Sequence, residues 1–398
     1  MNSGFKLFLF ALQFGGLAPS KCLVKNGENQ RLPLKRFHFI YPVFVLVISW
    51  FCAFRYFVYL AFLNSTSQYT APEVLLYICA IGYYLMTALF RTNFLLTYWR
   101  KWEDSPLKLY ERCHLDDELG KHLKHQLKGY ENGQTDQTDN LLWKWATFSG
   151  LCAFLSNFAF MLTLTIIQKY NYGTGSNIAI SHVLLQKNKD KEWPFIVAAF
   201  LGTTLNTFND TTHFGLALSA ALTFNVALRF RELRNWLKQN RINGKSINLK
   251  ATQELYCHLV DMIKEVDDKT VFGNGIIVAY AYLGILSSVY QLLYGEKFVI
   301  ATLSRFTFAF WMTTFMLMML TVIVPSVYAN KMAKKAKLEL VKFKLSKFID
   351  EKNDWNNANL QHFFASTKND EISLTFFRLV HLNSTSLLAV SFYFNFFL

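Results

Sequence analysis

Residues 298–328 read FVIATLSRFTFAFWMTTFMLMMLTVIVPSVY, an apolar run that holds one charged residue, Arg305. About 20 consecutive apolar residues are enough to cross a lipid bilayer as a helix. The run is followed by residues 331–349, in which lysines are interleaved with apolar residues at helical spacing. The change from the apolar run to the lysine-rich segment, with helical spacing in the latter, predicts a membrane helix that continues well beyond the bilayer.

Six further segments have the length and apolarity of membrane spans, and the composition agrees with them. Hydrophobic residues make up 52% of the 398 residues and charged residues 17%, whereas soluble proteins carry about 25% charged residues. The mean hydropathy is +0.18. We therefore predict an all-α polytopic membrane protein, with residues 1–398 forming one seven-helix domain. The predicted spans are 37–63, 74–99, 141–168, 211–227, 276–294, 298–328 and 374–398.

The distribution of basic residues predicts the orientation of the chain. Four of the segments between spans hold 31 of the 41 Lys and Arg residues, and the alternating segments hold five. Cytoplasmic loops carry such an excess, so the N-terminus is predicted inside the cell and the C-terminus outside. The net charge of +14 then reflects topology, and no nucleic acid partner is expected. The basic segments are 1–36, 100–140, 229–272 and 329–373.

Local patterns give two further expectations. Asn64 and Asn209 each begin an Asn-X-Ser/Thr motif at a predicted outer end and are predicted glycosylation sites. Residues 7–16 are apolar and follow Lys6, which fits either the core of a signal peptide or an amphipathic helix on the inner leaflet. The run is short and a basic segment follows it, so we favour the amphipathic helix.

The basic segments are predicted to be helical as well. Residues 253–268 form an amphipathic pattern that leads into the fifth span, and 331–349 extend the sixth. Their basic faces fit two interpretations. They could lie against anionic lipid, phosphoinositide included, or they could form a packed cytoplasmic base that joins several helices or subunits.

The sequence gives no sign of an enzyme. It lacks H-E-x-x-H, the P-loop, the nucleophile elbow and G-x-G-x-x-G, and its six cysteines are scattered without a C-x-x-C pair. No catalytic residue, cofactor or metal is therefore predicted. A coupled transporter is disfavoured too, because Asp210 is the only acidic residue at a span and seven spans do not form two equal halves.

A G-protein-coupled receptor also has seven spans, but three features oppose it. The predicted N-terminus is inside, the first two outside loops contain no cysteine, and no D-R-Y follows the third span. This class remains an alternative, as does a partner subunit that assembles without gating.

Four loose patterns lie between residues 12 and 388. They are 12–19 (LQFGGLAP), Phe208 to Ser219 with 229–233 (RFREL), 259–268 (LVDMIKEVDD), and Trp355 with 376–377, 382–383 and 387–388. Together they resemble the insect chemoreceptor superfamily and, within it, the gustatory receptors. The family closes its seventh span with T-Y, five apolar residues and Q-F. This chain has Tyr393 at that place without a following Gln-Phe, a divergent or shortened end that puts its pore in doubt.

The resemblance implies a receptor for small-molecule tastants in the plasma membrane of sensory neurons. It implies a ligand-gated, non-selective cation channel, formed by a homo- or hetero-tetramer with the seventh spans around the pore. A polar stripe at helical spacing in that span fits pore lining or packing against a partner helix. Its residues are His381, Ser384, Leu388, Ser391 and Asn395.

The resemblance also implies a ligand pocket in the outer half of the subunit. Such a pocket needs aromatic walls and a few polar groups. Arg91 is not a pocket candidate, because it lies near the predicted inner end of the span 74–99, where we expect it to meet lipid headgroups. The pocket candidates are Tyr83, Tyr84, Asn157, His213, Tyr290, Gln291, Arg305 and Trp311.

Overall fold

The computed structural model describes residues 3–18, 37–63, 71–99, 106–113, 118–127, 139–155, 211–294, 301–348, 375–376 and 380–381. Almost all of these residues are helical. The helices are α1 (Ser3–Phe14), α2 (Phe37–Leu63), α3 (Ala71–Trp99), α4 (Pro106–Cys113), α5 (Glu118–Gln126), α9 (Thr212–Ile242), α10 (Leu249–Tyr294) and α11 (Ala301–Phe348), with one more helix over 139–155. Two strands follow, β1 (Thr375–Phe376) and β2 (Val380–His381).

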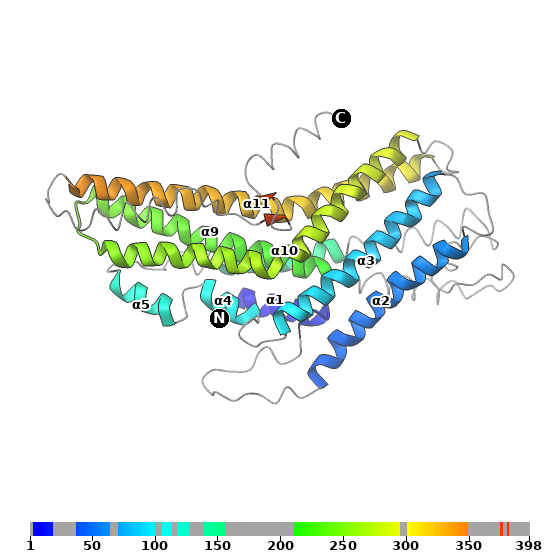
Figure 1. Cartoon of the computed structure of the whole chain (residues 1–398), viewed down its shortest axis with the longest axis horizontal. Helices are drawn as coiled ribbons and strands as arrows, with labels where there is room; N and C mark the ends of the chain where they lie inside the picture. The colour runs from blue at the N-terminus through cyan, green and yellow to red at the C-terminus, as the bar shows by residue number, and fades with distance from the viewer. Residues whose placement is uncertain are drawn as a thin grey trace.

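Helices α9, α10 and α11 form the body of the molecule (Figure 1). Helix α10 runs without a break over 46 residues and α11 over 48. At 1.5 Å per residue each is about 70 Å long, more than twice the roughly 30 Å of a bilayer core. The sequence predicted that the helix of the apolar run 298–328 continues beyond residue 328. This prediction is confirmed, because α11 continues to Phe348.

A short turn joins α9 to α10, and its sequence explains both helix ends. Gly244 has a φ of 62°, a left-handed conformation that glycine adopts without strain and that commonly ends a helix. The Asn248 side chain then accepts a hydrogen bond of 3.1 Å from the backbone N–H of Ala251. Such a cap satisfies one of the free N–H groups at the start of α10, so the chain reverses direction within a few residues.

Protein encloses α9 far more completely than its two neighbours. Among the described residues three helices are long and apolar enough to cross a membrane, namely α9, α10 and α11. The most apolar stretch of α9 is 89% buried inside the structure, against 44% for α10 and 39% for α11. The apolar residues of α9 therefore face protein, whereas the other two helices leave broad apolar surface uncovered.

Helix α1 is part of the folded core. Phe5, Phe8, Leu9 and Leu12 are fully buried, and the Phe5 ring stacks on Tyr110 of α4 at 3.7 Å. The opposite face is exposed and also apolar, with Leu7, Phe10 and Phe14 uncovered. Helix α1 is therefore a structural part of the bundle, because its removal would expose the residues it packs against.

A close approach of three helices marks one level of the molecule. The Phe90 ring of α3 lies against Gly215 of α9 and Gly273 of α10, where an added Cβ would come within 2.6 Å and 3.1 Å of it. Along α10, Gly273 lies 21 residues before Tyr294, or about 32 Å. This distance matches the thickness of a bilayer core, so the part of α10 from Gly273 to Tyr294 is long enough to cross a membrane. We call the part of the molecule between the Phe90 level and Tyr294 the outer half and the part on the other side of that level the inner half, after the orientation that the basic residues predict.

The predicted span 211–227 lies within α9, which is long and apolar enough to cross a membrane but is the most enclosed of the three such helices. The described part of α9 begins beside Phe90 and runs alongside the part of α10 before Gly273, which the charge pattern places in the cytoplasm. The Asn274 amide donates to Ser219 Oγ at 3.1 Å, and Phe230 packs on Tyr256, so the two helices stay paired. The apolarity of this stretch reflects burial in a protein core, a case that hydropathy does not separate from lipid exposure.

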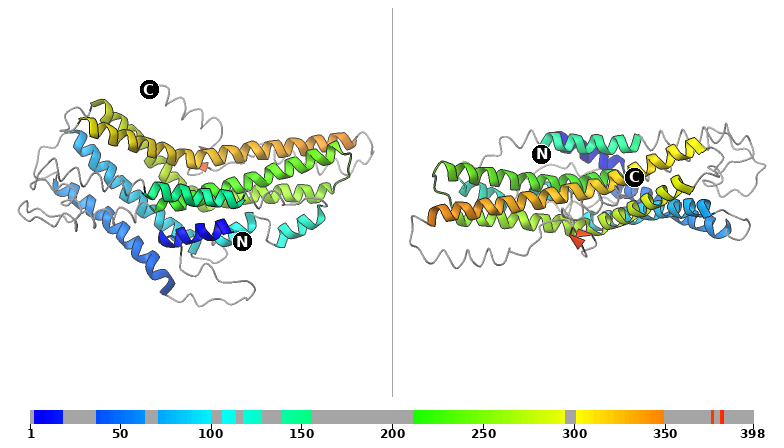
Figure 2. Two further views of the ribbon diagram at one scale, coloured as in Figure 1. Left: turned by 180° about the vertical axis from the view of Figure 1, so that it is seen from behind. Right: turned by 90° about the horizontal axis from the view of Figure 1, so that it is seen from above.

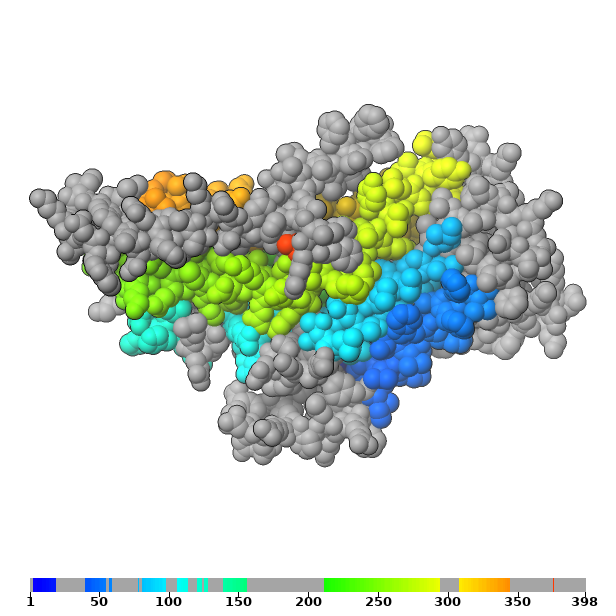
Figure 3. Space-filling view, in the orientation of Figure 1, coloured from blue at the N-terminus to red at the C-terminus, as the bar shows by residue number. Residues whose placement is uncertain are grey.

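The structure differs from the predicted span 374–398 at the start of that span, where two short strands lie instead of a helix. Strands β1 and β2 pair antiparallel, with Thr375 opposite His381 and Phe376 opposite Val380. Strand β1 packs against α10, and the red surface beside the middle of α10 in Figure 3 marks this strand. β-branched and aromatic residues favour this extended conformation. His381 lies in a strand, so the helical spacing that grouped it with Ser384 does not hold for it.

Candidate functional site

Aromatic rings and glycine notches join α3, α10 and α11 in the outer half. The Phe315 ring of α11 lies where a Cβ at Gly284 would be, at 2.5 Å, and it also meets Tyr280 edge-on at 5.3 Å. Tyr280 contacts Tyr83 of α3 at 6.1 Å, and Tyr83 contacts Tyr84 at 5.4 Å. A continuous aromatic wall therefore crosses all three helices.

Polar side chains lie further out on the same face of α10. Tyr280, Gly284, Ser288 and Gln291 follow spacings of four, four and three, so they share one side of the helix. Ser288 and Gln291 are each only 2% exposed. Gly284 of α10 lies beside Phe315 of α11, and the two helices run antiparallel. Gln291 is seven residues after Gly284 and Phe308 is seven residues before Phe315, so Gln291 and Phe308 lie at the same level.

Phe308 and Trp311 of α11 pack edge-on at 5.8 Å at this outer level. Phe308 is buried and Trp311 is partly buried against the core. We name the set Tyr83, Tyr280, Ser288, Gln291 and Trp311 the outer cluster. It combines aromatic walls with a hydroxyl and an amide, which is the chemistry of a site for a small, largely apolar molecule.

The structure groups some of the predicted pocket residues and separates others. Tyr83, Gln291 and Trp311 belong to the outer cluster, while Tyr84 turns to α2 and packs with Cys52 and Ala53. Tyr290 is 38% exposed and lies about 100° around α10 from the buried Gln291.

His213 is not part of the outer cluster. It lies at the start of α9, two residues from Gly215 and thus near the Phe90 level. Arg305 lies in the first turns of α11. Outside the described residues fall Asn157, the glycosylation sites Asn64 and Asn209, and Ser384, Leu388, Ser391 and Asn395.

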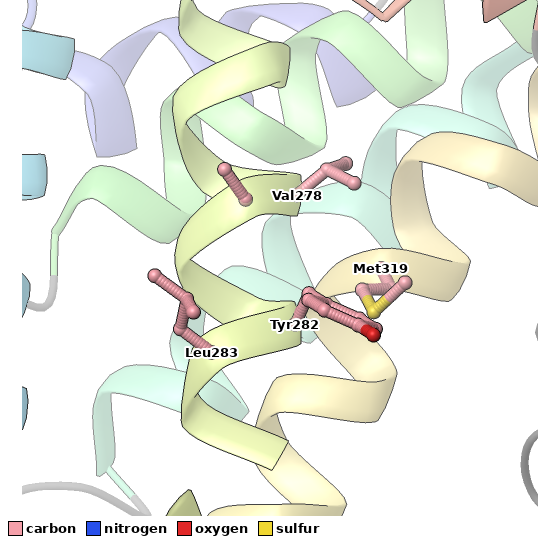
Figure 4. A pocket seen from close by; sticks show the side chains of 5 residues that line it. Val278, Tyr282, Leu283 and Met319 are labelled. Carbon is pink, nitrogen blue, oxygen red and sulfur yellow. The ribbon is translucent and has the colours of Figure 1, made fainter. Parts of the chain in front are cut away.

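A separate hollow opens on the other face of α10 (Figure 4). It measures about 450 Å³, and the surface that faces it is apolar. Among the described lining residues Tyr282 is the one with a hydrogen-bonding side chain, and its hydroxyl adds no polar surface to the hollow, so we do not place the ligand site in it. Its lining residues are Val278, Ala279, Tyr282, Leu283 and Met319.

A buried ion pair at the inner end explains the RFREL pattern. Arg229 Nη2 donates to Asp139 Oδ2 at 2.8 Å with both side chains 1% exposed, and Nη1 reaches Glu232 at 3.1 Å. Phe230 is fully buried, and Leu233 nearly so. The pattern therefore binds α9 to the helix over 139–155 and to the surrounding core.

Two further ion pairs tie the inner helices together. Arg241 of α9 contacts Glu339 of α11 at 3.2 Å, and Arg112 of α4 contacts Glu265 of α10. Burial raises the pKa of Glu265, but Lys269 and Arg112 outweigh it and leave that pKa below its usual value. Burial raises the pKa of the Cys113 thiol well above its usual range, so this cysteine stays protonated and unreactive.

Arg91 was predicted to meet lipid headgroups, and this was wrong. It is 1% exposed, and its Nη1 donates to the Gly15 carbonyl at 2.8 Å just past the end of α1. Its Nη2 donates to Thr211 Oγ1, which in turn donates to the same carbonyl at 3.0 Å. A cation favours the carboxyl end of a helix, so Arg91 fixes α1 to α3 and α9.

Sequence reasoning also missed the contact between α10 and β1. Asp267 accepts two hydrogen bonds from Thr375, which lies 108 residues away in the chain. The pattern 259–268 contains Asp267, but no local signal names its partner. Among the described residues no group of His, Cys, Asp or Glu could hold a metal ion.

This arrangement of long helices is the fold of an insect olfactory receptor. The chain is similar to olfactory receptor OR5 from Machilis hrabei, solved in complex with eugenol, with a TM-score of 0.63 and 13% sequence identity. The similarity covers 98% of this chain and 95% of that chain. No family model and no curated protein matches the sequence. At this identity the likeness establishes the fold of a multi-pass helical membrane protein.

Proposed function

We propose that the chain is a chemosensory receptor of the insect chemoreceptor superfamily, of the gustatory type, and a ligand-gated non-selective cation channel. The observation that carries this proposal is the likeness to an olfactory receptor over 98% of the chain. The patterns along the sequence favour the gustatory branch. The proposed location is the plasma membrane of sensory neurons, with the N-terminus in the cytoplasm and the C-terminus outside.

The proposed ligand is a small molecule that binds at the outer cluster. The olfactory receptor it resembles was solved with eugenol, a small molecule. In this chain an aromatic or apolar ligand would pack on Tyr83, Tyr280 and Trp311, and a hydroxyl on it would pair with Ser288 or Gln291. Arg305 and Asn157 remain proposed members of the pocket.

The proposed assembly is a homo- or hetero-tetramer, in which four copies of the last segment surround the pore. Ser384, Ser391 and Asn395 would face the pore, and Leu388 would form an apolar constriction. Ligand binding would favour the conformation in which this constriction widens and fills with water.

Expression of the full chain, with a C-terminal epitope tag, in cells that lack other chemoreceptors tests the proposal. We expect the tag to be labelled on intact cells and eugenol, or a panel of sugars and alkaloids, to evoke a current that reverses near 0 mV. A tag that is labelled only after permeabilisation, on a chain at the surface, would remove the channel. Current that requires a second receptor chain would indicate a partner subunit.

A pair of neighbouring variants tests the site. Gln291→Leu removes the buried amide and should raise the half-maximal ligand concentration about tenfold, the value of a buried hydrogen bond. Tyr290→Phe alters the exposed neighbour and should leave it within about threefold. Equal effects of the two variants would place the ligand elsewhere.

A further inference from the structure

A carboxylate clamp joins α10 to the strand pair. The backbone N–H of Thr375 donates to Oδ1 of Asp267 and the Thr375 hydroxyl donates to Oδ2, both at 2.7 Å. Asp267 is 8% exposed and Thr375 is 9% exposed. Hydrogen bonds to an ionised group are about twice as strong as neutral ones, and burial shields these two from water. The backbone N–H and the hydroxyl of Thr375 are thus both held by the Asp267 carboxylate of α10.

The clamp lies directly across the strand pair from the start of the last segment. Thr375 is paired with His381, and Phe376 is paired with Val380. His381 immediately precedes residues 382–398, which hold the proposed pore-lining side chains. The position of Asp267 therefore fixes where the chain sets out toward that segment.

The other end of the same helix carries the outer cluster. Tyr280, Ser288 and Gln291 follow Asp267 on α10 by 13, 21 and 24 residues, or about 20 to 36 Å along the axis. Helix α10 contains no proline and no break over this distance. A shift or rotation at the outer cluster therefore moves Asp267, and with it the two donors of Thr375.

We propose that Asp267 is a positioning residue that couples the outer cluster to the last segment through Thr375 and the strand pair. This inference rests on the proposed function and deepens it, because it names the contact through which ligand binding would reach the pore. The clamp would hold 375–381 to α10, so that a movement of α10 displaces His381 and the chain after it.

Four variants of the full chain test the coupling. Asp267→Asn replaces one carboxylate oxygen by an amide that cannot accept, and Thr375→Val is a milder variant that removes only the hydroxyl. Thr375→Ser keeps both the backbone N–H and the hydroxyl donor and should behave like the wild-type chain. Asp261→Asn removes the same charge from an exposed position of the same helix and serves as the matched control.

Three measurements separate coupling from folding. Hydrogen exchange should show faster exchange of the 375–381 amides in Asp267→Asn and Thr375→Val only. The maximal eugenol-evoked current per surface chain, or that of the panel compound most active on wild type, should fall about tenfold in Asp267→Asn. The rise in thermal unfolding temperature with that compound should equal that of wild type, because the ligand still binds.

Each contrary result has a distinct meaning. Faster exchange of the strand pair with an unchanged maximal current would overturn the coupling and leave the proposed function intact. An equal loss of current and of the ligand's thermal shift would show that Asp267 only supports folding. Wild-type chain that reaches the surface and passes no current with any compound would overturn the proposed function, and the coupling with it.

Discussion

The inner and outer halves of the bundle share the same two long helices, α10 and α11, but they are held together by different forces. In the inner half α9 closes the bundle, and Arg229, Arg241 and Arg112 form ion pairs between helices. In the outer half the described contacts include rings against glycines, such as Phe315 against Gly284, and rings against one another, such as Tyr83 against Tyr280. The rear and upper views in Figure 2 show α2 and α3 diverging from the inner bundle.

This difference indicates which half can change shape. A buried ion pair has one favourable geometry, because separating its members leaves an uncompensated charge. Ring packing is less directional, and aromatic rings can shift against one another at small cost. We therefore expect the inner half to act as a rigid base that keeps its packing and moves as one body, and the outer half to be the part that changes shape.

The largest expected effect is on the Arg229–Asp139 pair. Asp139→Ala would leave Arg229 buried without its main partner and should lower the free energy of unfolding by about 3–5 kcal/mol. Replacing both residues together, Asp139→Leu with Arg229→Met, should recover much of this loss. Arg231→Met, at the exposed position of the same pattern, should change it by less than about 0.5 kcal/mol. Thermal unfolding of the detergent-solubilised chain measures all of these. A small effect of Asp139→Ala would contradict a rigid base.

The next effect tests whether α1 belongs to that base. Phe8→Ala empties a fully buried site and should cost about 3 kcal/mol. Phe10→Ala changes a side chain that is 63% exposed and should cost less than about 0.5 kcal/mol in detergent. Similar unfolding temperatures for the two variants would show that α1 is not packed against the inner half.

A smaller effect is expected at the outer ring packing. Gly284→Ala forces Phe315 to move and should cost about 1–3 kcal/mol, partly offset by the better helix propensity of alanine. Phe315→Leu in the same chain should relieve the contact and restore stability. If Gly284→Ala instead stabilises the chain and leaves ligand responses unchanged, the outer half is looser than the ring contacts indicate.

The smallest effect concerns pH and Glu265. Its pKa is lowered in the folded state, so its ion pairs add stability above its usual value near 4.5 and lose it as the pH falls through the lower folded pKa. Because the groups are partly exposed, Glu265→Gln should cost about 0.5–1 kcal/mol at pH 7. Unfolding temperatures from pH 7 to pH 4 should show this difference shrinking below about pH 4.5. A difference that stays constant would mean that the carboxylate contributes no charge interaction.

Much of the fold could be predicted from the sequence. Residues 37–63 form α2 as predicted, 74–99 lie in α3, and 276–294 lie in α10. Long apolar runs between basic segments define such helices without reference to the rest of the chain. For the stretch 211–227, apolarity alone does not distinguish a lipid environment from a protein core, and the most apolar part of α9 is 89% buried.

The site was only partly predictable. Aromatic and polar types at outer positions predicted Tyr83, Gln291 and Trp311, which the proposed outer cluster includes, but the pattern did not reveal that Tyr290 is exposed. The roles of Arg91 and Asp267 depend on partners 76 and 108 residues away. A single sequence carries no signal for contacts at such separations.

The burial of α9 has a consequence for synthesis of the protein. Its first half is long and apolar enough to be taken up by the insertion machinery, and its main packing partner, α11, is made about 60 residues after α9 ends. Its second half holds Arg229, Arg231, Arg234, Lys238 and Arg241. We expect these basic residues to act during biogenesis, as a retention signal that holds the second half of α9 on the side that the charge pattern predicts to be cytoplasmic until the bundle closes.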